Sequence, residues 1–387
     1  MGESNDRNQV SLKLLEITFG NPTSHSGGIE DTTLNLVKEL SSMGYEITCA
    51  FCRNEAESGS EKLERVRSIC MLSGKASGIR NLALLKILFN VWLFFYLIKH
   101  SRDFDAIQVN GDNGGLLTLF RRRGTVFSLP GLTILKGRSL FGGSNFLRRA
   151  IMGTIYFPSM IFELLALRFC AAAVCDNVVT EKAILDSLDP SKVFLISNSI
   201  DPVHFYPVRN QVERRALRMK LGLAESGMYA IWVGTNPFNY GLDRAIEAVL
   251  SVQSKWRLIV VGPPQTVKDD RIRYAGFLDH SALGDYYRAS DVMLFPKRYQ
   301  GIELAVLSAM LSGVVPILDS KFSPAYFSAN EVFFVDDVAD IVRMLDSLAY
   351  DPGKIEQKVQ NAVARASQHL PVNCARKYDK LFRSITK

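Results

Sequence analysis

Apolar and polar positions at the start of the chain follow two periods, one typical of strands and one typical of helices. Lys13–Phe19 (KLLEITF) is a short apolar run that predicts a strand, and Gly20–Gly28 is a loop of turn-forming residues. Hydrophobic positions then recur at helical spacing over Ile29–Leu40, and Tyr45–Phe51 (YEITCAF) predicts a second strand. This strand–loop–helix–strand unit predicts a parallel sheet.

The same alternation continues to about residue 320. Further predicted strands are Ser68–Leu72, Ala106–Asn110, Thr125–Leu129, Ala171–Cys175, Val193–Ser197, Tyr229–Val233, Arg257–Val261, Val292–Phe295 and Val314–Leu318. Helices are predicted between most of them, including Gly241–Val252, Ser281–Arg288 and Glu303–Leu311. The polar stretch Asp201–Glu213 contains two prolines, which places a hinge near residue 205.

This order of elements predicts an α/β protein. A length of 387 residues fits two or three domains. We expect two Rossmann-like, doubly wound parallel-sheet domains, residues 1–204 and 205–370. In such a fold the ligand cleft is expected between the halves, at the carboxyl ends of the strands.

Two apolar stretches raise the question of a membrane. Leu82–Ile98 has 17 residues, of which only Lys86 and Asn90 are polar, and Ala150–Cys175 is interrupted by proline and charges. A spanning helix needs about 20 predominantly apolar residues. Two interpretations therefore remain, a buried helix of a large α/β domain or a helix that lies on a bilayer surface.

A basic segment favours the second interpretation. No acidic residue lies between Asp112 and Glu163, and the basic residues of that interval are Arg121, Arg122, Arg123, Lys136, Arg138, Arg148 and Arg149. Large apolar residues are interleaved with them. Residues 114–162 could therefore contact an anionic membrane surface or a lipid phosphate, or form an ordinary solvated face.

Composition limits the classes of binding partner and the cellular compartment that we expect. The net charge of +7 is a modest excess, which fits an acidic ligand but does not indicate nucleic acid. Six cysteines without a framework spacing favour a reducing compartment, and Cys49-x-x-Cys52 is interpreted as part of a strand rather than a metal site. The polar N-terminus lacks the apolar region of a signal peptide. We expect a cytoplasmic protein, with peripheral attachment to the inner face of the membrane as an alternative.

Five segments, in matching order and spacing, resemble the GT-B glycosyltransferases of glycosyltransferase family 4. They are Gly27-Gly28-Ile29-Glu30; Asn198-Ser199-Ile200-Asp201 with Phe205 and Pro207; Val233-Gly234 with Gly241; Ile272–Leu278 leading to Ala289-Ser290-Asp291-Val292; and Pro296, Gly301-Ile302, Leu307-Ser308-Ala309-Met310 and Gly313. No single segment is specific, but the set covers about residues 12 to 320.

The resemblance implies a hexosyltransferase of polysaccharide or glycolipid biosynthesis. It would move a sugar from a nucleotide-sugar donor to a saccharide or lipid-linked acceptor, with retention of configuration. By the same resemblance, no metal or other cofactor is expected. Glycine loops at helix N-termini would bind the diphosphate. The implied donor-binding residues are Gly27, Gly28, Asn198, Gly234, Thr235, Asn236, Tyr240, Gly262, Gln300, Gly301, Ile302, Leu304 and Ser308. By the same resemblance, Pro371–Lys387 would be a helix that packs back on the first domain.

The sequence departs from the family where charge matters most. The family's Arg after V-G and Lys before the next glycine are Thr235 and Tyr240 here, and its paired glutamates are Gln300 and Ser308. One well-placed electrostatic donor contributes roughly 3–4 kcal/mol to a transition state. The missing charges therefore need replacement if the chain is a catalyst.

The candidates for replacement are Lys297, Arg298, Glu303 and His25. Lys297 and Arg298 would supply cations, Glu303 would bind a sugar hydroxyl, and His25 would shuttle a proton or bind phosphate. Their structural alternatives are an exposed basic pair, an acid that favours the helix dipole, and a solvated loop histidine. Two functions remain open: a glycosyltransferase, or a catalytically degenerate GT-B protein that binds a nucleotide, a sugar or a partner subunit. A nicotinamide enzyme is disfavoured, because no G-x-G-x-x-G follows the first strand.

Overall fold

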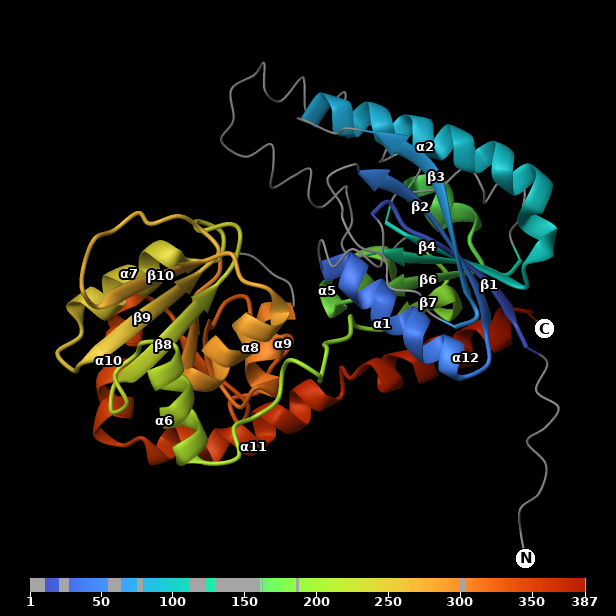
Figure 1. The fold of residues 1–387 in the computed structure, drawn as a ribbon. Helices are drawn as coiled ribbons and strands as arrows, with labels where there is room; N and C mark the ends of the chain where they lie inside the picture. The colour runs from blue at the N-terminus through green and yellow to red at the C-terminus, as the bar shows by residue number, and fades with distance from the viewer. Residues whose placement is uncertain are drawn as a thin grey trace, which may run out of the picture. The chain divides into compact units, whose positions relative to one another are not determined.

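The chain divides into two compact units, which we describe separately (Figure 1). The computed structural model describes residues 11–20, 28–54, 64–74, 79–111, 123–129, 161, 163–185, 188–298 and 304–386. The first unit comprises residues 1–198 and 371–387, and the second comprises residues 199–370. The division at residue 199 lies a few residues before the predicted boundary at 204. The C-terminal segment belongs to the first unit.

The first unit contains a seven-stranded parallel sheet in the order β3-β2-β1-β4-β5-β6-β7. Its strands are β1 (Lys13–Ile17), β2 (Glu46–Asn54), β3 (Val66–Gly74), β4 (Ala106–Asn110), β5 (Thr125–Leu129), β6 (Ala172–Cys175) and β7 (Val193–Leu195). Its labelled helices are α1 (Gly28–Ser42), α2 (Ile79–His100), η1 (Ser101–Asp103), α5 (Val178–Leu185), η3 (Pro190–Lys192) and α12 (Pro371–Thr386).

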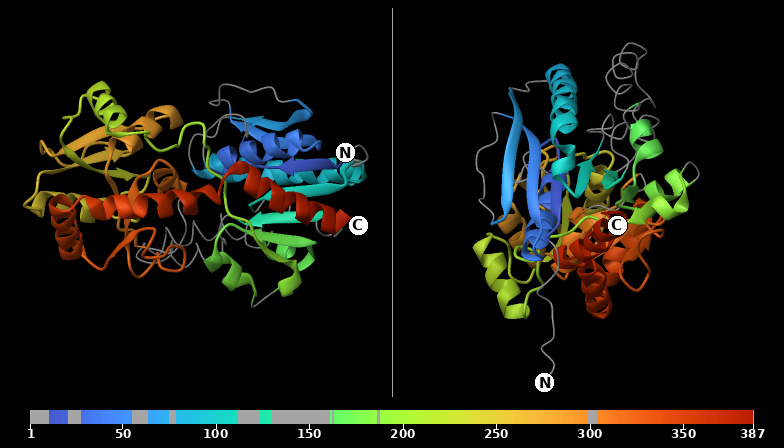
Figure 2. Two further views of the ribbon diagram at one scale, coloured as in Figure 1. Left: turned by 90° about the horizontal axis from the view of Figure 1, so that it is seen from below. Right: turned by 90° about the vertical axis from the view of Figure 1, so that its right-hand side faces the viewer.

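Helices cover both faces of this sheet. One buried cluster joins α1 and α12 to one face, through residues such as Leu36, Leu40 and Phe382. The other joins α2 and α5 to the opposite face, through residues such as Phe89 and Ile184. Figure 2 shows α12 beside α1, although the two helices stand at opposite ends of the sequence. This arrangement is the predicted doubly wound α/β fold.

The second unit contains a six-stranded parallel sheet in the order β10-β9-β8-β11-β12-β13. Its strands are β8 (Met228–Val233), β9 (Trp256–Val261), β10 (Ile272–Gly276), β11 (Val292–Phe295), β12 (Val315–Asp319) and β13 (Phe333–Val335). Its helices are α6 (Gln211–Lys220), α7 (Leu242–Ser251), α8 (His280–Ala289), α9 (Leu304–Leu311), α10 (Val338–Tyr350) and α11 (Gly353–Ser367). Leu242, Val249 and Leu345 bury α7 and α10 against the sheet.

Local sequence signals explain where several of these helices begin. The side chains of Asn210, Asp279 and Asp337 accept hydrogen bonds from the first turns of α6, α8 and α10. Such caps satisfy backbone N–H groups that have no partner within the helix.

Each sheet has a point where the order in which strands are added changes from one side of the sheet to the other. This point lies between β1 and β4 in the first sheet and between β8 and β11 in the second. These two switch points are where a ligand is expected in an open parallel sheet.

The predicted apolar helix Leu82–Ile98 lies within α2, and only part of it is buried. Phe89, Leu93 and Leu97 are buried in the first unit, whereas Trp92 and Phe95 are 45% and 65% exposed. Neither predicted interpretation describes the whole helix, because one side packs on the sheet and another faces outward. Among the helices of the described residues, none combines the length and apolar character needed to cross a membrane. Of the basic segment 114–162, the structure describes only 123–129 and 161.

Candidate functional site

The switch point of the second sheet brings two loops to one edge. Strands β8 and β11 are hydrogen-bonded neighbours, with Val292 opposite Ala230. Residues 234–241 connect β8 to α7, and residues 296–303 connect β11 to α9. The structure therefore places Gly234, Thr235, Asn236 and Tyr240 near the loop of Lys297 and Arg298, at the carboxyl ends of their strands. Residues 299–303 lie outside the described residues.

Glycines allow the backbones at this edge to approach closely. Gly241, with φ of 71°, stands where a Cβ atom would be 2.2 Å from the carbonyl oxygen of Pro296. Gly262, with φ of 115°, stands where a Cβ would be 2.1 Å from the carbonyl oxygen of Gly234. Both positive φ angles and both contacts exclude a side chain. Among the predicted residues, Gly234 and Gly262 thus contribute to the shape of the loops.

Arg298 fastens the two loops together. Its guanidinium makes a bidentate ion pair with the Asp243 carboxylate, at 2.8 and 2.6 Å, and lies 4.5 Å from the centre of the Phe238 ring. Its backbone N–H donates to Asn239 at 2.9 Å. The hydrogen bond from Arg298 lowers the pKa of Asp243, and the same bond raises the pKa of Arg298. The predicted ligand role of Arg298 stays a prediction, since the cation already has a carboxylate partner.

Lys297 is not part of an exposed basic pair, so that interpretation is wrong. Its side chain is 2% exposed, and its Nζ lies 5.6 Å from the centre of the Tyr326 ring. This burial was not predicted, because lysine side chains in folded proteins mostly face solvent. The structure thus places a buried ammonium group directly after β11.

A second ion pair braces the same edge. Arg244, in the first turn of α7, holds the buried carboxylate of Asp319 at 2.8 Å, and also donates to the carbonyl oxygen of Pro296 at 3.4 Å. Asp319 is the last residue of β12. Arg244 and Arg298 are therefore each paired with a carboxylate at this edge, and Arg298 follows the buried Lys297 in the chain. Arg244 was not among the predicted site residues, because its partner Asp319 is distant in the chain.

The Tyr240 ring packs into the base of the loop. It lies 5.2 Å from the Phe295 ring and 6.4 Å from the Trp232 ring, and it covers Gly234 so closely that a Cβ there would be 2.4 Å from Tyr240 Cδ2. Thr235 and Asn236 remain exposed. The position of the family's lysine is thus filled by a packed aromatic ring, and the neighbouring exposed groups are neutral.

The remaining predicted site residues lie in three places: in α9, in the first unit, and outside the described residues. Leu304 begins α9 and is half-buried, and Ser308 is 5% exposed in that helix, so the position of a family carboxylate is a buried serine. Gly28 begins α1, and the Asn198 side-chain amide donates to Asp176 at 3.4 Å in the first unit. The predictions for His25, Gly27, Gln300, Gly301, Ile302 and Glu303 fall outside the described residues.

A buried group of polar side chains lies at the switch point of the first sheet. This polar layer consists of Glu16, Gln108, Asn110, Ser128 and Tyr378. Asn110 donates to Glu16 Oε1 at 2.5 Å, Gln108 donates to Ser128 at 3.2 Å, and the Ser128 and Tyr378 hydroxyls are 2.8 Å apart. Beside Glu16, a cavity of about 30 Å³ is lined by other members of the layer. A space of that size holds about one water molecule.

Glu16 is the unusual member of the polar layer. It is 0% exposed, and its Oε2 atom has no hydrogen-bond partner among the described residues. Burial raises its pKa to about 8, although the hydrogen bond from Asn110 acts in the opposite direction. Glu16 was not among the site residues predicted from the sequence. The available signal was a single glutamate within the apolar run of the first strand.

Comparisons with known proteins agree with this architecture. Residues 228–350 match the family Glycosyl transferases group 1. A curated relative, the lipopolysaccharide core biosynthesis mannosyltransferase LpsB of Rhizobium meliloti (strain 1021), is 24% identical over 202 residues, which cover 46% of this chain and 56% of that protein. The chain thus spans about half the length of this relative.

Solved structures match over nearly the whole chain. Sucrose-phosphate synthase from Thermosynechococcus elongatus has a TM-score of 0.78 at 16% identity, covering 96% of this chain and 98% of its own. Anabaena Alr3699/HepE, solved in complex with UDP and glucose, has a TM-score of 0.68 at 14% identity, covering 96% and 100%. At such identities the likeness concerns the fold. The chain therefore has the GT-B fold, and its residues 228–350 match the family Glycosyl transferases group 1.

Proposed function

We propose that the protein is a glycosyltransferase that moves a sugar from a nucleotide-sugar donor to a saccharide or lipid-linked acceptor. The observation that carries the proposal is the gathering of Arg244, Lys297 and Arg298 at the carboxyl edge of β8 and β11, within the group 1 domain. A diphosphate is the anionic part of such a donor. The complexes of HepE with UDP and with UDP-glucose support a nucleotide-sugar as the donor class.

In the proposed mechanism, the cationic side chains and the neutral polar side chains at this edge have different tasks. Negative charge develops on the leaving diphosphate, and fixed cations stabilise it without reorganising. Lys297 and Arg298 would provide that charge in place of the two family cations. Thr235 and Asn236, exposed on the neighbouring loop, would donate neutral hydrogen bonds. By resemblance the transfer retains the configuration of the sugar and uses no metal ion.

Calorimetric titration with UDP, GDP, ADP and CDP tests the donor site. We expect binding of one diphosphate, weakened at least about tenfold in Lys297→Met, which corresponds to loss of one charge-assisted contact of about 1.4 kcal/mol or more. Arg343→Ala, which removes a 70% exposed cation of α10, is the matched control and should bind normally. Failure to bind any nucleotide contradicts the proposal.

The pair Arg298→Ala and Asp243→Asn separates two roles of Arg298. If Arg298 contacts the diphosphate, Asp243→Asn releases its guanidinium and leaves binding unchanged or tighter, while Arg298→Ala weakens it. If Arg298 only fastens the loop, both substitutions weaken binding equally. The two variants remove the same ion pair from opposite sides, so each is the control for the other.

A second function, binding without catalysis, is favoured by Tyr240 and Ser308. A packed tyrosine ring and a buried serine stand where the family has a lysine and a glutamate. Release of nucleoside diphosphate from UDP-sugars and GDP-sugars, with and without saccharide acceptors, distinguishes the two. Turnover supports the enzyme, and tight binding without turnover supports the binder.

We also propose that α2 attaches the first unit to an anionic lipid surface. Its outward side carries large apolar residues at helical spacing, each 45–65% exposed: Ile87, Leu88, Val91, Trp92, Phe95 and Ile98. An apolar helix face with tryptophan and phenylalanine is typical of helices that lie in a bilayer interface. We call these six residues the α2 stripe.

A small excess of basic residues near the C-terminal end of α2 supports an anionic lipid partner over a neutral one. An open groove at the amino ends of β1 to β3 reaches the last turns of α2 and is lined by Lys13, Arg65 and Arg67. The groove also contains Glu46 and Asp103, so its cations exceed its carboxylates by one before His100 is counted. Basic residues next to an apolar helix attract anionic headgroups.

Co-sedimentation with vesicles tests the attachment. The wild-type protein should bind vesicles that contain phosphatidylglycerol and bind neutral phosphatidylcholine vesicles more weakly. Phe95→Asp should abolish binding, because it places a charge in the centre of the α2 stripe. Phe277→Asp, at a phenylalanine that is 76% exposed in the second unit, is the matched control. Equal loss in both variants, or equal binding by Phe95→Asp and wild type, contradicts a role for α2.

A further inference from the structure

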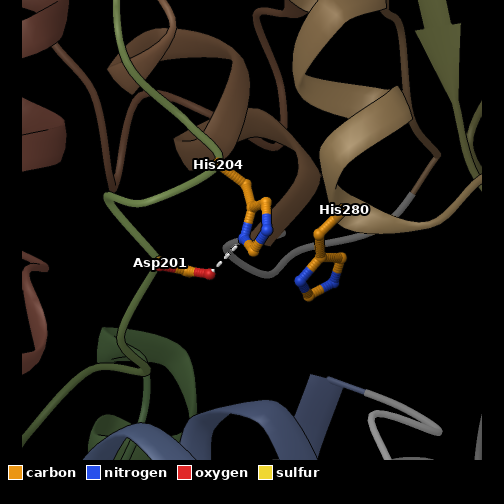
Figure 3. A group of neighbouring side chains, drawn as sticks. All are labelled: Asp201, His204 and His280. Atoms are coloured by element: carbon orange, nitrogen blue, oxygen red, sulfur yellow. Dashed lines mark hydrogen bonds and ion pairs between the residues drawn. The ribbon is translucent and has the colours of Figure 1, made fainter.

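Three side chains of metal-ligating type lie close together in the second unit, on segments other than the two loops 234–241 and 296–303. Asp201 and His204 belong to the turn that precedes α6, and His280 is the first residue of α8. One ligand atom of each residue can be chosen so that all three lie within 4.8 Å of one another. Figure 3 shows the carboxylate and the two imidazole rings converging from these two elements.

We infer that Asp201, His204 and His280 form a binding site for one zinc-class divalent metal ion. Two imidazole nitrogens and a carboxylate oxygen are donors that suit Zn²⁺ and its neighbours, whereas Mg²⁺ and Ca²⁺ prefer sites built only of oxygen. Bonds of 2.0–2.2 Å to a tetrahedral ion place ligand atoms about 3.3 Å apart. The Asp201–His204 contact is 2.6 Å, so it would open by less than 1 Å.

The backbone holds the two elements in register without an ion. The carbonyl oxygen of His204 accepts a hydrogen bond from Arg288 Nη1 at 3.0 Å. The same oxygen lies against Gly284, where a Cβ atom would be only 2.3 Å away. Gly284 and Arg288 stand one and two turns after His280 on α8. The turn is therefore pressed against the helix that carries the third ligand, which reduces the reorganisation that binding requires.

The surrounding charges permit a cation. The positive end of α8 is capped by the Asp279 carboxylate, which accepts from the N–H of Ala282 at 2.8 Å. The guanidinium of Arg288 is paired with Asp285 and lies over the Tyr206 ring. Neither group points a free positive charge at the cluster. All three ligand residues are partly exposed, so an ion and one or more water ligands can enter.

The metal would act on the structure rather than on sugar transfer. It would tie the turn that begins the second unit to the start of α8, in addition to the bond from Arg288. Binding to the folded state alone raises the melting temperature in proportion to the logarithm of metal concentration over Kd. At a hundredfold excess over Kd, the second unit should melt about 5–10 °C higher.

The test titrates the full-length, EDTA-treated protein with Zn²⁺ by calorimetry, with melting followed in parallel. All variants carry Cys70→Ser, because Cys70 is an exposed thiol that could bind zinc by itself. We expect one equivalent of Zn²⁺, and a loss of affinity of at least about 100-fold in His204→Ala and in His280→Ala, since even groups that merely orient a ligand contribute about 10–100-fold. Mg²⁺ should produce no shift.

Two further variants make the result decisive. Asp201→Asn keeps the acceptor for the Val203 N–H and so keeps the turn, yet it should weaken zinc binding because it removes the carboxylate charge. His100→Ala is the matched control: His100 pairs with Asp103 at 2.9 Å with the same three-residue spacing, but among the described residues no second histidine joins that pair, and its loss should leave binding unchanged. Metal-free variants should melt within a few degrees of the parent. The inference is overturned if the parent does not bind Zn²⁺, or if His204→Ala and His280→Ala bind Zn²⁺ as tightly as the parent does.

Discussion

Glu16 should make the first unit less stable as the pH rises. Its pKa is raised from 4.5 to about 8 by burial in the polar layer, so between these values the folded state holds a proton that the unfolded state releases. The contribution of Glu16 to stability is therefore largest below pH 4.5 and falls as the pH increases towards 8, by about 1.4 kcal/mol per unit. Over the whole interval the loss is roughly 4–5 kcal/mol, a large share of the stability of a domain.

Glu16→Gln isolates this effect. The amide oxygen can accept from Asn110 as Glu16 Oε1 does, and the side chain has no charge at any pH. The variant should equal the wild type near pH 5 and exceed it by several kcal/mol near pH 8.5. Hydrogen exchange of peptides from β1 and β4, compared between variant and wild type at the same pH, reports this difference directly, because intrinsic exchange rates cancel.

Glu46→Gln is the control, since Glu46 begins the neighbouring strand but is exposed. Its exchange should follow the wild type at every pH. If Glu16→Gln also runs parallel to the wild type from pH 5 to 8.5, Glu16 is not the titrating group and the reasoning is refuted. A variant that is less stable throughout would mean that the polar layer needs the carboxyl group itself.

Three other predictions concern packing and reactivity. Gly241→Ala should lower stability at least about 2 kcal/mol more than Gly276→Ala, because both have positive φ but only the first meets a backbone oxygen; equal melting temperatures would contradict this. Arg218→Ala should cost roughly 1.5–3 kcal/mol in urea unfolding, because it removes the two hydrogen bonds from Arg218 Nη2 to the Asp291 carboxylate, while Arg214 and the Tyr229 N–H still contact that carboxylate; Arg218→Lys should be intermediate, and a loss below about 1 kcal/mol would refute the role of the pair. A thiol reagent should label Cys70 rapidly in the folded protein, since the other five cysteines, all in the described part of the chain, are buried; several fast thiols would contradict the burial.

The sequence pattern was sufficient for the parallel sheets. Strands such as Ala106–Asn110 and Val292–Phe295 have the predicted bounds, because a continuous apolar run is what a strand covered on both faces requires. β10 and β13 were not predicted as strands. β10 contains an arginine and a terminal glycine, and β13 has only three residues, so neither forms a recognisable run.

The chemistry of the site was less accessible to sequence reasoning. Burial of Lys297 and its approach to Tyr326 depend on how α9 and the following segments fold over β11, which no local pattern contains. Arg298 was identified as a cation, but its partner Asp243 lies 55 residues earlier in the chain. His204 and His280 are likewise distant in sequence. Spacing reveals a metal motif when its ligands share one element, and here they do not.

The return of α12 to the first unit has a consequence for protein synthesis. Tyr378 completes the polar layer, and Phe382 packs in the cluster that α1 covers, so this face lacks one of its two helices until residues 371–386 have left the ribosome. Residues 199–370 have all their strands and helices earlier. The unit that is translated first therefore matures last, and its uncovered apolar face is a natural binding site for a chaperone during elongation. A stop codon shortly before residue 371 would then impair the N-terminal unit, far upstream of the truncation.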